Sequence, residues 1–350
     1  MDMRQFIFSI MAFSLFGLFS CKANYTNLDV NGFSARIDTP DPVRLIDVRT
    51  PEEFSEGHLR GAVNHDWYDS LFIDKVSSAY DKSAPLNIYC RSGRRASEAA
   101  EALSKAGFEV FNLTGGYLAW TEAGKPVTKY EVERFQTPGG KVVELTLIKH
   151  GTLEVSYDGL SIQFDPVGEY GKLTDYSAEF PKADYIFVTH EHGDHLDEAA
   201  ISALTGDNTV LFLNGTSQGK IGKGEVLSNG DSKELAKGVK VEVVPAYNTT
   251  PGREKFHPKG NGNGYVLTLD GLRVYVAGDT EDVPEMADLK GIDVALLPVN
   301  QPYTMTVDQC VSAALSFKPK VLIPYHFGQT DISSLPARLP GIDVRLRDMR

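Results

Sequence analysis

Three histidines and one aspartate within six residues form the densest group of metal-binding side chains in the sequence. His190, His192, Asp194 and His195 closely follow the apolar run DYIFV. Neutral imidazole and carboxylate groups suit zinc, manganese or iron. An isolated histidine is most often a solvated or core residue, but three of the chain's eight histidines lie in this segment. The sequence therefore predicts a metal site here.

Two more side chains of the same kind stand at the ends of apolar runs. Asp279 follows VYVAG, and His326 follows VLIPY. In open α/β layers, functional groups gather where strands end. We therefore expect both residues to join the metal site. The alternative for Asp279 is a turn-capping role beside Gly278.

A cysteine offers a different chemistry. Cys90 ends the run LNIYC and precedes an alanine-rich helical segment. Backbone amides at a helix N-terminus and nearby arginines favour a thiolate, and they would hold an anionic persulfide or an oxyanion. We therefore predict that Cys90 is catalytic and that its substrate loop consists of Arg91, Ser92, Gly93, Arg94 and Arg95. The alternative, a buried structural cysteine, leaves the glycine and the arginines of the loop unexplained.

The elements around these residues predict an α/β protein with two domains, since 350 residues exceed one ordinary core. Residues 25–125 alternate strand-like and helix-like runs, which favours a small parallel sheet flanked by helices. Residues 126–140 combine prolines and glycines with many charges and are predicted to be a linker. Residues 141–350 open with three β runs joined by tight turns, which predicts an antiparallel meander.

The first domain resembles a single-domain rhodanese. The resemblance rests on LIDVRTPEEFSEGHLRGAVN, YCRSGRRASEAAEAL and NLTGGYLAW. It implies that Cys90 takes a sulfane sulfur from a donor as a persulfide and passes it to a thiol acceptor. By the same resemblance, Arg91 and Arg94 contact the anionic substrate. Asp47 and Arg49 either support the loop or form a buried ion pair.

The segment 141–350 resembles the metallo-β-lactamase superfamily, an αβ/βα sandwich, and especially its ascorbate-phosphate lactonase-like branch. The resemblance implies two divalent metal ions, with zinc expected and manganese or iron as alternatives. His190 and His192 would hold the first ion, Asp194, His195 and His326 the second, and Asp279 would bridge both. A metal-activated water would attack an ester, a lactone or a phosphodiester. Asp194 would also help to orient that water.

The sequence departs from this family at one ligand. The family usually carries a histidine after the strand VKVEVVP, where this chain has Asn248, a poor zinc ligand. His257, in the following loop, is a possible replacement as ligand or proton donor, and an ordinary loop residue is the equal alternative. The first metal position could also be weak. His150, at the end of the first strand, could face the pocket, but we expect a core or edge histidine. Asn300, Tyr303 and Thr304 either contact substrate or form a turn.

The first 21 residues resemble a bacterial lipoprotein signal, with Arg4, an apolar stretch and Cys21. We therefore expect an exported protein, anchored to the membrane by a lipid on Cys21 and facing the periplasm or the exterior. An uncleaved signal anchor is the alternative. Cys310 is expected to be a buried helical residue. A net charge of −12 without a basic run argues against nucleic-acid partners.

Three functions remain open at this point. The leading one is a metal-dependent hydrolase of small molecules fused to a sulfurtransferase. The second is an iron-dependent persulfide dioxygenase supplied by Cys90, which would need one iron and oxygen. The third makes the rhodanese-like part a non-catalytic docking module.

Overall fold

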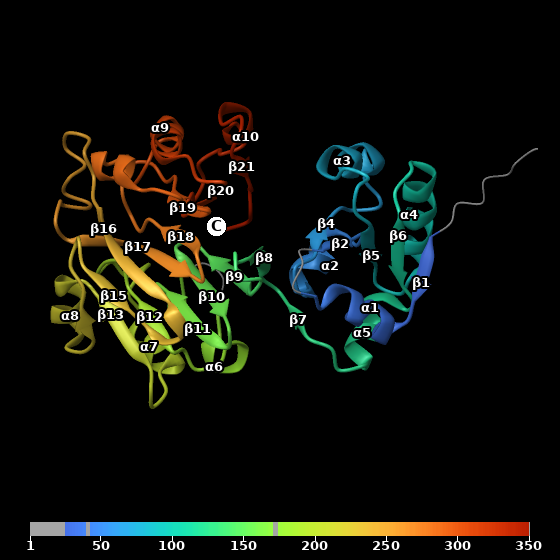
Figure 1. Cartoon of the computed structure of the whole chain (residues 1–350), viewed down its shortest axis with the longest axis horizontal. Coiled ribbons are helices and arrows are strands. Elements are labelled where there is room, and N and C mark those ends of the chain that lie inside the picture. The colour runs from blue at the N-terminus through green and yellow to red at the C-terminus, as the bar shows by residue number, and fades with distance from the viewer. Residues whose placement is uncertain (1–24, 40–42, 171–173, 350) are drawn as a thin grey trace, which may run out of the picture.

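The computed structural model describes residues 25–39, 43–170 and 174–349 (Figure 1). The predicted export signal lies outside these residues, so lipidation of Cys21 stays a prediction. Within the described ranges, no helix is long and apolar enough to cross a membrane.

The first domain is built on a five-stranded parallel sheet, as the alternating pattern predicted. The strands lie in the order β1-β6-β5-β2-β4. Their bounds are β1 Thr26–Leu28, β2 Arg44–Asp47, β4 Val63–Asn64, β5 Leu86–Tyr89 and β6 Val110–Leu113. The helices are α1 Val30–Ile37, α2 Pro51–Glu56, α3 Phe72–Ala79, α4 Arg94–Lys105 and α5 Gly116–Glu122. Because side chains alternate along a strand, Ile88 joins one apolar cluster and Tyr89 the other.

The second domain consists of two seven-stranded mixed sheets, which confirms the predicted sandwich class. The first sheet has the order β14-β13-β12-β11-β10-β9-β8 and the second the order β15-β16-β17-β18-β19-β20-β21. The first sheet comprises β8 Glu131–Gln136, β9 Val142–Lys149, β10 Thr152–Tyr157, β11 Leu160–Phe164, β12 Tyr185–Phe187, β13 Val210–Leu213 and β14 Glu225–Val226. The second comprises β15 Ser232–Glu234, β16 Lys240–Ala246, β17 Gly262–Leu269, β18 Leu272–Val276, β19 Val294–Pro298, β20 Val321–Tyr325 and β21 Asp343–Val344.

One large core lies between these two sheets. Val155 and Phe164 of the first sheet share it with Val266 and Leu296 of the second. The helices of this domain are α6 Tyr176–Glu179, α7 Glu198–Leu204, α8 Gly215–Ile221, α9 Val307–Phe317 and α10 Leu335–Arg338, with 3-10 turns η1 Ala236–Gly238 and η2 Pro284–Asp288. Cys310 of α9 is fully buried in this core, as predicted. The predicted meander is present as the antiparallel strands β9, β10 and β11.

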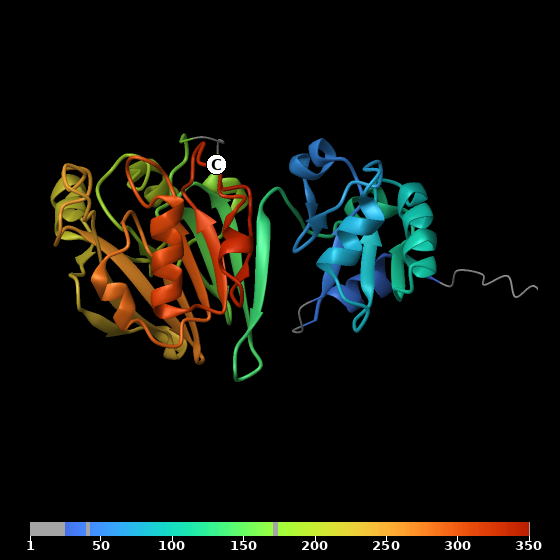
Figure 2. The same ribbon diagram turned by 90° about the horizontal axis from the view of Figure 1, so that it is seen from above.

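The segment predicted as a linker contains two strands. Val127–Thr128 forms β7, which pairs with β3, His58–Leu59, of the first domain. β8 follows at once and pairs with β9 as the edge strand of the first seven-stranded sheet. Figure 2 shows β8 on the side of the second domain that faces the first. The charged residues of EVERFQ indicated a linker, but they belong to an edge strand, where charges prevent pairing with another chain.

Ion pairs connect the two domains across this edge. Glu144 of β9 accepts hydrogen bonds from Arg60 of the first domain, at 2.8 Å, and from Arg134 of β8, at 2.7 Å. Arg134 also donates to the backbone carbonyl of Ile37, at 3.1 Å. The contact between the domains is therefore polar, as is usual for domains within one chain.

Candidate metal centre

The histidine motif occupies the loop between β12 and α7. The loop turns back at His192, whose backbone carbonyl accepts hydrogen bonds from the amides of His195 and Leu196. Asp197 then caps α7 by accepting from the amides of Ala199 and Ala200. This tight turn points several imidazoles towards one region. Six of the chain's eight histidines lie in groups there that could hold a metal ion.

The first group consists of His190, His192 and His257. The Nε2 atom of His190 lies 3.0 Å from Nδ1 of His192. The ring of His257 lies 5.1 Å from the ring of His190 and 5.0 Å from that of His192. We refer to these three histidines as the first pocket.

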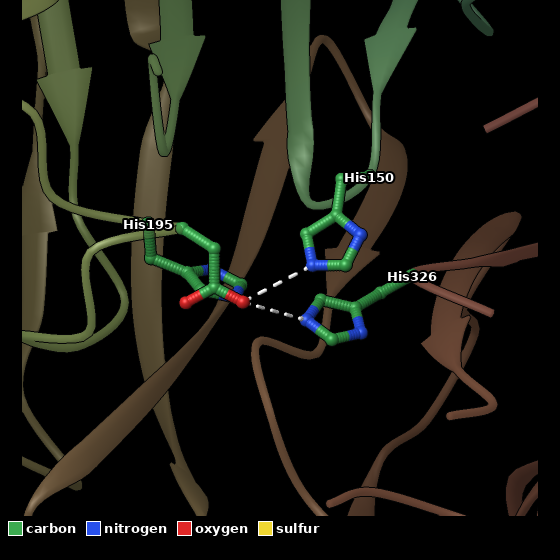
Figure 3. Close-up of side chains that lie close together, drawn as sticks. His150, His195 and His326 are labelled. Atoms are coloured by element: carbon green, nitrogen blue, oxygen red, sulfur yellow. Dashed lines mark hydrogen bonds and ion pairs between the residues drawn. The ribbon is translucent and has the colours of Figure 1, made fainter. Parts of the chain in front are cut away.

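The second group consists of His150, Asp194, His195 and His326. Oδ2 of Asp194 lies 3.1 Å from Nε2 of His150, 3.6 Å from Nε2 of His326 and 3.9 Å from Nε2 of His195. Figure 3 shows the interactions of His150 and His326 with one carboxylate oxygen, and labels His195 beside them. We refer to these four residues as the second pocket.

Asp279 lies between the two pockets. Its Oδ1 atom is 3.3 Å from Nε2 of His195 and 3.3 Å from Nε2 of His326. Its Oδ2 atom is 3.3 Å from Nε2 of His257 and 3.9 Å from Nε2 of His190. One carboxylate therefore presents one oxygen to each pocket, which is the arrangement that a bridging ligand requires.

The donor atoms fit a metal ion better than they fit one another. Nε2 of His195, His257 and His326 and Oδ1 of Asp279 are buried, and none has a hydrogen-bond partner among the described residues. Leaving a buried polar atom unpartnered is costly, so native structures rarely do so without a ligand. Imidazole nitrogens and carboxylate oxygens at this spacing match the usual donor set of a zinc or manganese centre.

Burial favours the neutral imidazoles that metal binding needs. It lowers the pKa of His150, His190 and His192. His195 behaves differently: burial opposes its charge, but the carboxylates of Asp279 and Asp165 raise its pKa to about 10. The two carboxylates therefore favour a positive charge at this position, which a bound metal ion would also supply.

Asp165 orients the imidazole of His195 through a contact with its Nδ1 atom. Its Oδ2 atom lies 2.7 Å from Nδ1 of His195, while Thr189 donates its amide and hydroxyl to the same carboxylate. With a metal ion bound, this contact favours the neutral imidazole that is protonated on Nδ1 and can ligate through Nε2, a usual arrangement for ligating histidines. The sequence prediction missed Asp165, although it directly follows β11 as Asp279 and His326 follow β18 and β20.

His150 was predicted to be a core or edge residue, yet the structure places it in the second pocket. It follows β9, and its backbone adopts the left-handed conformation with φ of 47°. Asp165 and His326 share this conformation, with φ of 43° and 49°. Such backbone angles are uncommon outside glycine and cluster at functional sites.

Asn248, which stands where the family usually has a histidine, supports His257. Its backbone amide donates to the carbonyl of His257 at 2.9 Å. Its side-chain amide donates to the carbonyls of Tyr303, at 2.7 Å, and Arg253, at 3.2 Å. Nδ1 of His257 lies 3.1 Å from the same Tyr303 carbonyl, so Nε2 of His257 is left facing Asp279.

In the predicted turn, Asn300 lies beside the second pocket, whereas the carbonyl of Tyr303 contacts His257 of the first. The side-chain amide of Asn300 is 3.4 Å from Nδ1 of His326. Thr304 is buried, and its hydroxyl accepts a hydrogen bond from the amide of Asn300. Tyr303 as a residue is 47% exposed, which leaves it available to a ligand.

Cys90 lies at the N-terminus of α4, as predicted. Its Sγ atom accepts a hydrogen bond from the amide of Gly93 at 3.1 Å, and the residue is 1% exposed. Gly116 approaches the Cys90 carbonyl so closely that a Cβ atom could not fit. Arg91, Ser92 and Arg94 are exposed around the loop.

Two of the arginines predicted near Cys90 have structural partners. Arg95 makes two hydrogen bonds to Glu53, at 2.7 and 2.8 Å. Arg49 is buried with Asp47 and donates to it at 2.7 Å, which matches the ion-pair alternative. Arg91 and Arg94 are therefore the loop arginines left to meet an anionic substrate.

The geometry agrees with comparisons to known proteins. Residues 144–326 match the family described as a beta-lactamase superfamily domain. The chain belongs to the metallo-β-lactamase superfamily. Residues 29–123 match a rhodanese-like domain, so this superfamily member carries a rhodanese-like domain before its hydrolase domain. The predicted resemblances to a rhodanese and to the metallo-β-lactamase superfamily are thereby confirmed.

Relatives of this superfamily member are metal-dependent hydrolases by name. A UPF0173 metal-dependent hydrolase from Natranaerobius thermophilus is 31% identical over 191 residues, which are 53% of this chain and 83% of that protein. A solved structure from Parabacteroides distasonis, described as a candidate metal-dependent hydrolase, is 56% identical and covers 63% of this chain and 100% of its own, with a TM-score of 0.61. A metallo hydrolase from Ignicoccus hospitalis is 28% identical and covers 59% of this chain and 95% of its own, with a TM-score of 0.51.

Proposed function

We propose that the hydrolase domain uses two divalent metal ions, zinc in the first instance, to hydrolyse a small molecule with an ester, lactone or phosphodiester bond. The position of Asp279 carries this proposal, because its two oxygens face two separate groups of ligands. The names of the relatives support metal-dependent hydrolysis, and the substrate class rests on the resemblance to lactonase-like hydrolases.

Each side chain has a proposed part in this reaction. His190, His192 and His257 would hold one ion and the second pocket the other, with Asp279 between them. Bound ions of this kind supply Lewis acidity and bring the pKa of water towards neutrality. The side chain of Asp194 is 26% exposed, against 3% for Asp279, and would help to orient the attacking water.

His257 is proposed as the ligand that replaces the missing strand-end histidine. It is 5% exposed, its Nδ1 is held by a backbone carbonyl, and its Nε2 faces Asp279. This arrangement supports a metal ligand over an ordinary loop residue. It also keeps the first pocket complete, with three imidazoles, although position 248 is an asparagine.

We further propose that the rhodanese-like domain is a sulfurtransferase. The Cys90 thiolate would attack the outer sulfur of a persulfide donor, which forms a cysteine persulfide and releases the donor as a thiolate. A thiolate acceptor would then take the outer sulfur and restore the Cys90 thiolate. The Gly93 amide, the N-terminus of the twelve-residue helix α4 and the exposed Arg91 and Arg94 support this role.

The predicted location is also a proposal. We propose that the chain is exported and anchored by a lipid on Cys21, so that both domains lie outside the cytoplasm. The support is the composition of residues 1–21. Metabolic labelling of the expressed chain with a fatty-acid analogue, with Cys21→Ala as the unlabelled control, tests it.

A substrate panel tests the hydrolase proposal. The chain without residues 1–21 would be incubated with aryl esters, lactones and bis-aryl phosphodiesters, before and after removal of metal by a chelator. We expect turnover of one class that is lost on chelation and restored by zinc or manganese. Turnover that survives both chelation and an Asp279→Asn substitution would contradict a metal-dependent reaction at this centre.

A further inference from the structure

We infer that His150 is a fourth protein ligand of the second pocket, and that the two pockets therefore hold their metal ions in different ways. This inference rests on the proposed two-metal function and extends it. It assigns one more protein ligand to the ion of the second pocket than to the ion of the first, which leaves more room for water or substrate at the first pocket.

The distances around Asp194 carry the assignment. A tetrahedral metal about 2.1 Å from each ligand atom places those atoms roughly 3.4 Å from one another. Oδ2 of Asp194 lies 3.1, 3.6 and 3.9 Å from the Nε2 atoms of His150, His326 and His195, which brackets that spacing. Figure 3 shows the ring of His150 beside the ring of His326, with their interactions converging on one oxygen.

The backbone holds His150 in this position. Its amide donates to the carbonyl of Met349, and its own carbonyl accepts a hydrogen bond from the amide of His326 at 3.1 Å. The left-handed conformation at both residues turns the two imidazoles in the same direction, with ring centroids 3.6 Å apart. Strained backbone is retained where surrounding contacts enforce it, as they do here. His150 is only 5% exposed, so solvation by bulk water does not explain the position of its ring.

The pockets then differ in the number of ligands. The second pocket offers four side chains of its own in addition to the shared Asp279, whereas the first offers three histidines and the shared Asp279. The more protein ligands a zinc ion has, the fewer positions it keeps for water, and closed sites are usually structural. We therefore expect the second pocket to bind its ion first and release it last.

If His150 only donates a hydrogen bond to Asp194 and does not bind the ion, a different experimental result is expected. The Nε2 atom of His150 is within hydrogen-bond distance of Asp194, so it could merely donate a proton to that carboxylate and position it. In that case a side chain with an amide donor would preserve metal binding. A direct ligand would not be replaced by such a donor.

Cobalt spectroscopy of His150→Cys tests direct coordination. The experiment uses residues 22–350 with Cys90→Ser, so that buried Cys310 is the remaining native thiol. After loading with two equivalents of Co²⁺, we expect a thiolate-to-cobalt charge-transfer band in the near ultraviolet for His150→Cys. The matched control is His65→Cys in the first domain, where we expect no band. Two bound cobalt ions without that band in His150→Cys would overturn the inference.

A second measurement applies if the cysteine variant binds metal poorly. Competition with a chromophoric chelator gives the two zinc dissociation constants of the wild type, of His150→Ala and of His150→Gln. We expect both variants to weaken the tighter site by on the order of 100-fold or more, the upper end of what loss of an orienting residue costs, and to leave the weaker site unchanged. Recovery of wild-type affinity in His150→Gln would overturn the inference. Fewer than two zinc ions in the wild type would instead refute the two-metal function, so the two failures are distinguishable.

Discussion

Nδ1 of His195 lies 2.7 Å from the Asp165 carboxylate, and this contact fixes which nitrogen of His195 faces the metal centre. Both residues are fully buried; Asp165 directly follows β11, and His195 lies in the loop between β12 and α7. The orientation of His195 thus depends on a carboxylate that belongs to neither pocket.

Replacing Asp165 by asparagine should weaken metal binding at the second pocket. The amide cannot hold the proton of His195 on Nδ1 as a carboxylate does, so we expect a 10- to 100-fold loss, about the usual effect of such orienting residues. Chelator competition measures it. Asp231→Asn, which changes an exposed turn aspartate, is the matched control and should bind zinc normally. Equal affinity in both variants would contradict the orienting role.

Loss of His257 should empty the first pocket and spare the second. For His257→Ala we expect about one zinc ion per chain and a large loss of hydrolysis, because three imidazoles become two. Elemental analysis of the purified variant gives the number. Full metal content and full turnover in this variant would show that His257 is an ordinary loop residue.

Asn248→Asp should reproduce part of that defect without removing a ligand. The carboxylate cannot donate to the carbonyls of Tyr303 and Arg253, so the loop that carries His257 loses its anchor. We expect weaker zinc binding at the first pocket and an unchanged second one. The control is Asn229→Asp, which loses a similar pair of hydrogen bonds to Gly262 and Asn263. A matching effect in the control would point to general destabilisation.

Sulfur transfer and hydrolysis should respond to separate substitutions. Cys90→Ser is expected to abolish transfer of sulfane sulfur to a thiol acceptor, because the hydroxyl cannot form the persulfide, and to leave ester or phosphodiester hydrolysis at the wild-type rate. Cys310→Ala, at the buried cysteine of α9, should retain both activities. Unchanged sulfur transfer in Cys90→Ser would remove the catalytic role of that domain and leave a docking role.

The rhodanese-like domain should become less stable in acid because Glu53 becomes protonated there. The hydrogen bonds from Arg95 lower the pKa of Glu53 to about 2, below its ordinary value of 4.5. A carboxyl whose pKa falls on folding stabilises the fold above its unfolded pKa, and the contribution disappears as the pH drops towards about 2. Both tryptophans, Trp67 and Trp120, lie in this domain, so their fluorescence follows its unfolding alone. We expect Glu53→Gln to unfold at a lower temperature than the wild type at pH 6, with the difference shrinking below about pH 4. A constant difference down to pH 2 would be inconsistent with this ion pair.

The sequence alone predicted most secondary-structure elements. It also predicted the ligands that lie in a short motif or at the end of a strand. His190, His192, Asp194 and His195 are contiguous, so local spacing alone brings them together. Asp279 and His326 were found because parallel strands bring their ends to one edge. The same rule would have found Asp165 and His150, but a lone residue after an antiparallel meander gives no sign that its strand ends at that edge.

The remaining errors have physical causes. The sequence of β8 was predicted to be a linker because this edge strand has many charges and is followed by a proline and two glycines, as a loop often is. The roles of Asn248 and Arg95 depend on contacts with Tyr303 and Glu53, which are 55 and 42 residues away in sequence. Pairings over such distances are set by the assembled fold and leave no local pattern.

The metal content of the unmodified protein tests the two-metal hydrolase most directly. Residues 22–350 would be purified without chelators and analysed for metals, with oxygen uptake recorded in the presence of glutathione persulfide. We predict close to two zinc or manganese ions per chain, about one after Asp279→Ala, and no oxygen uptake. One iron per chain together with rapid oxygen uptake would contradict the hydrolase and identify a persulfide dioxygenase instead.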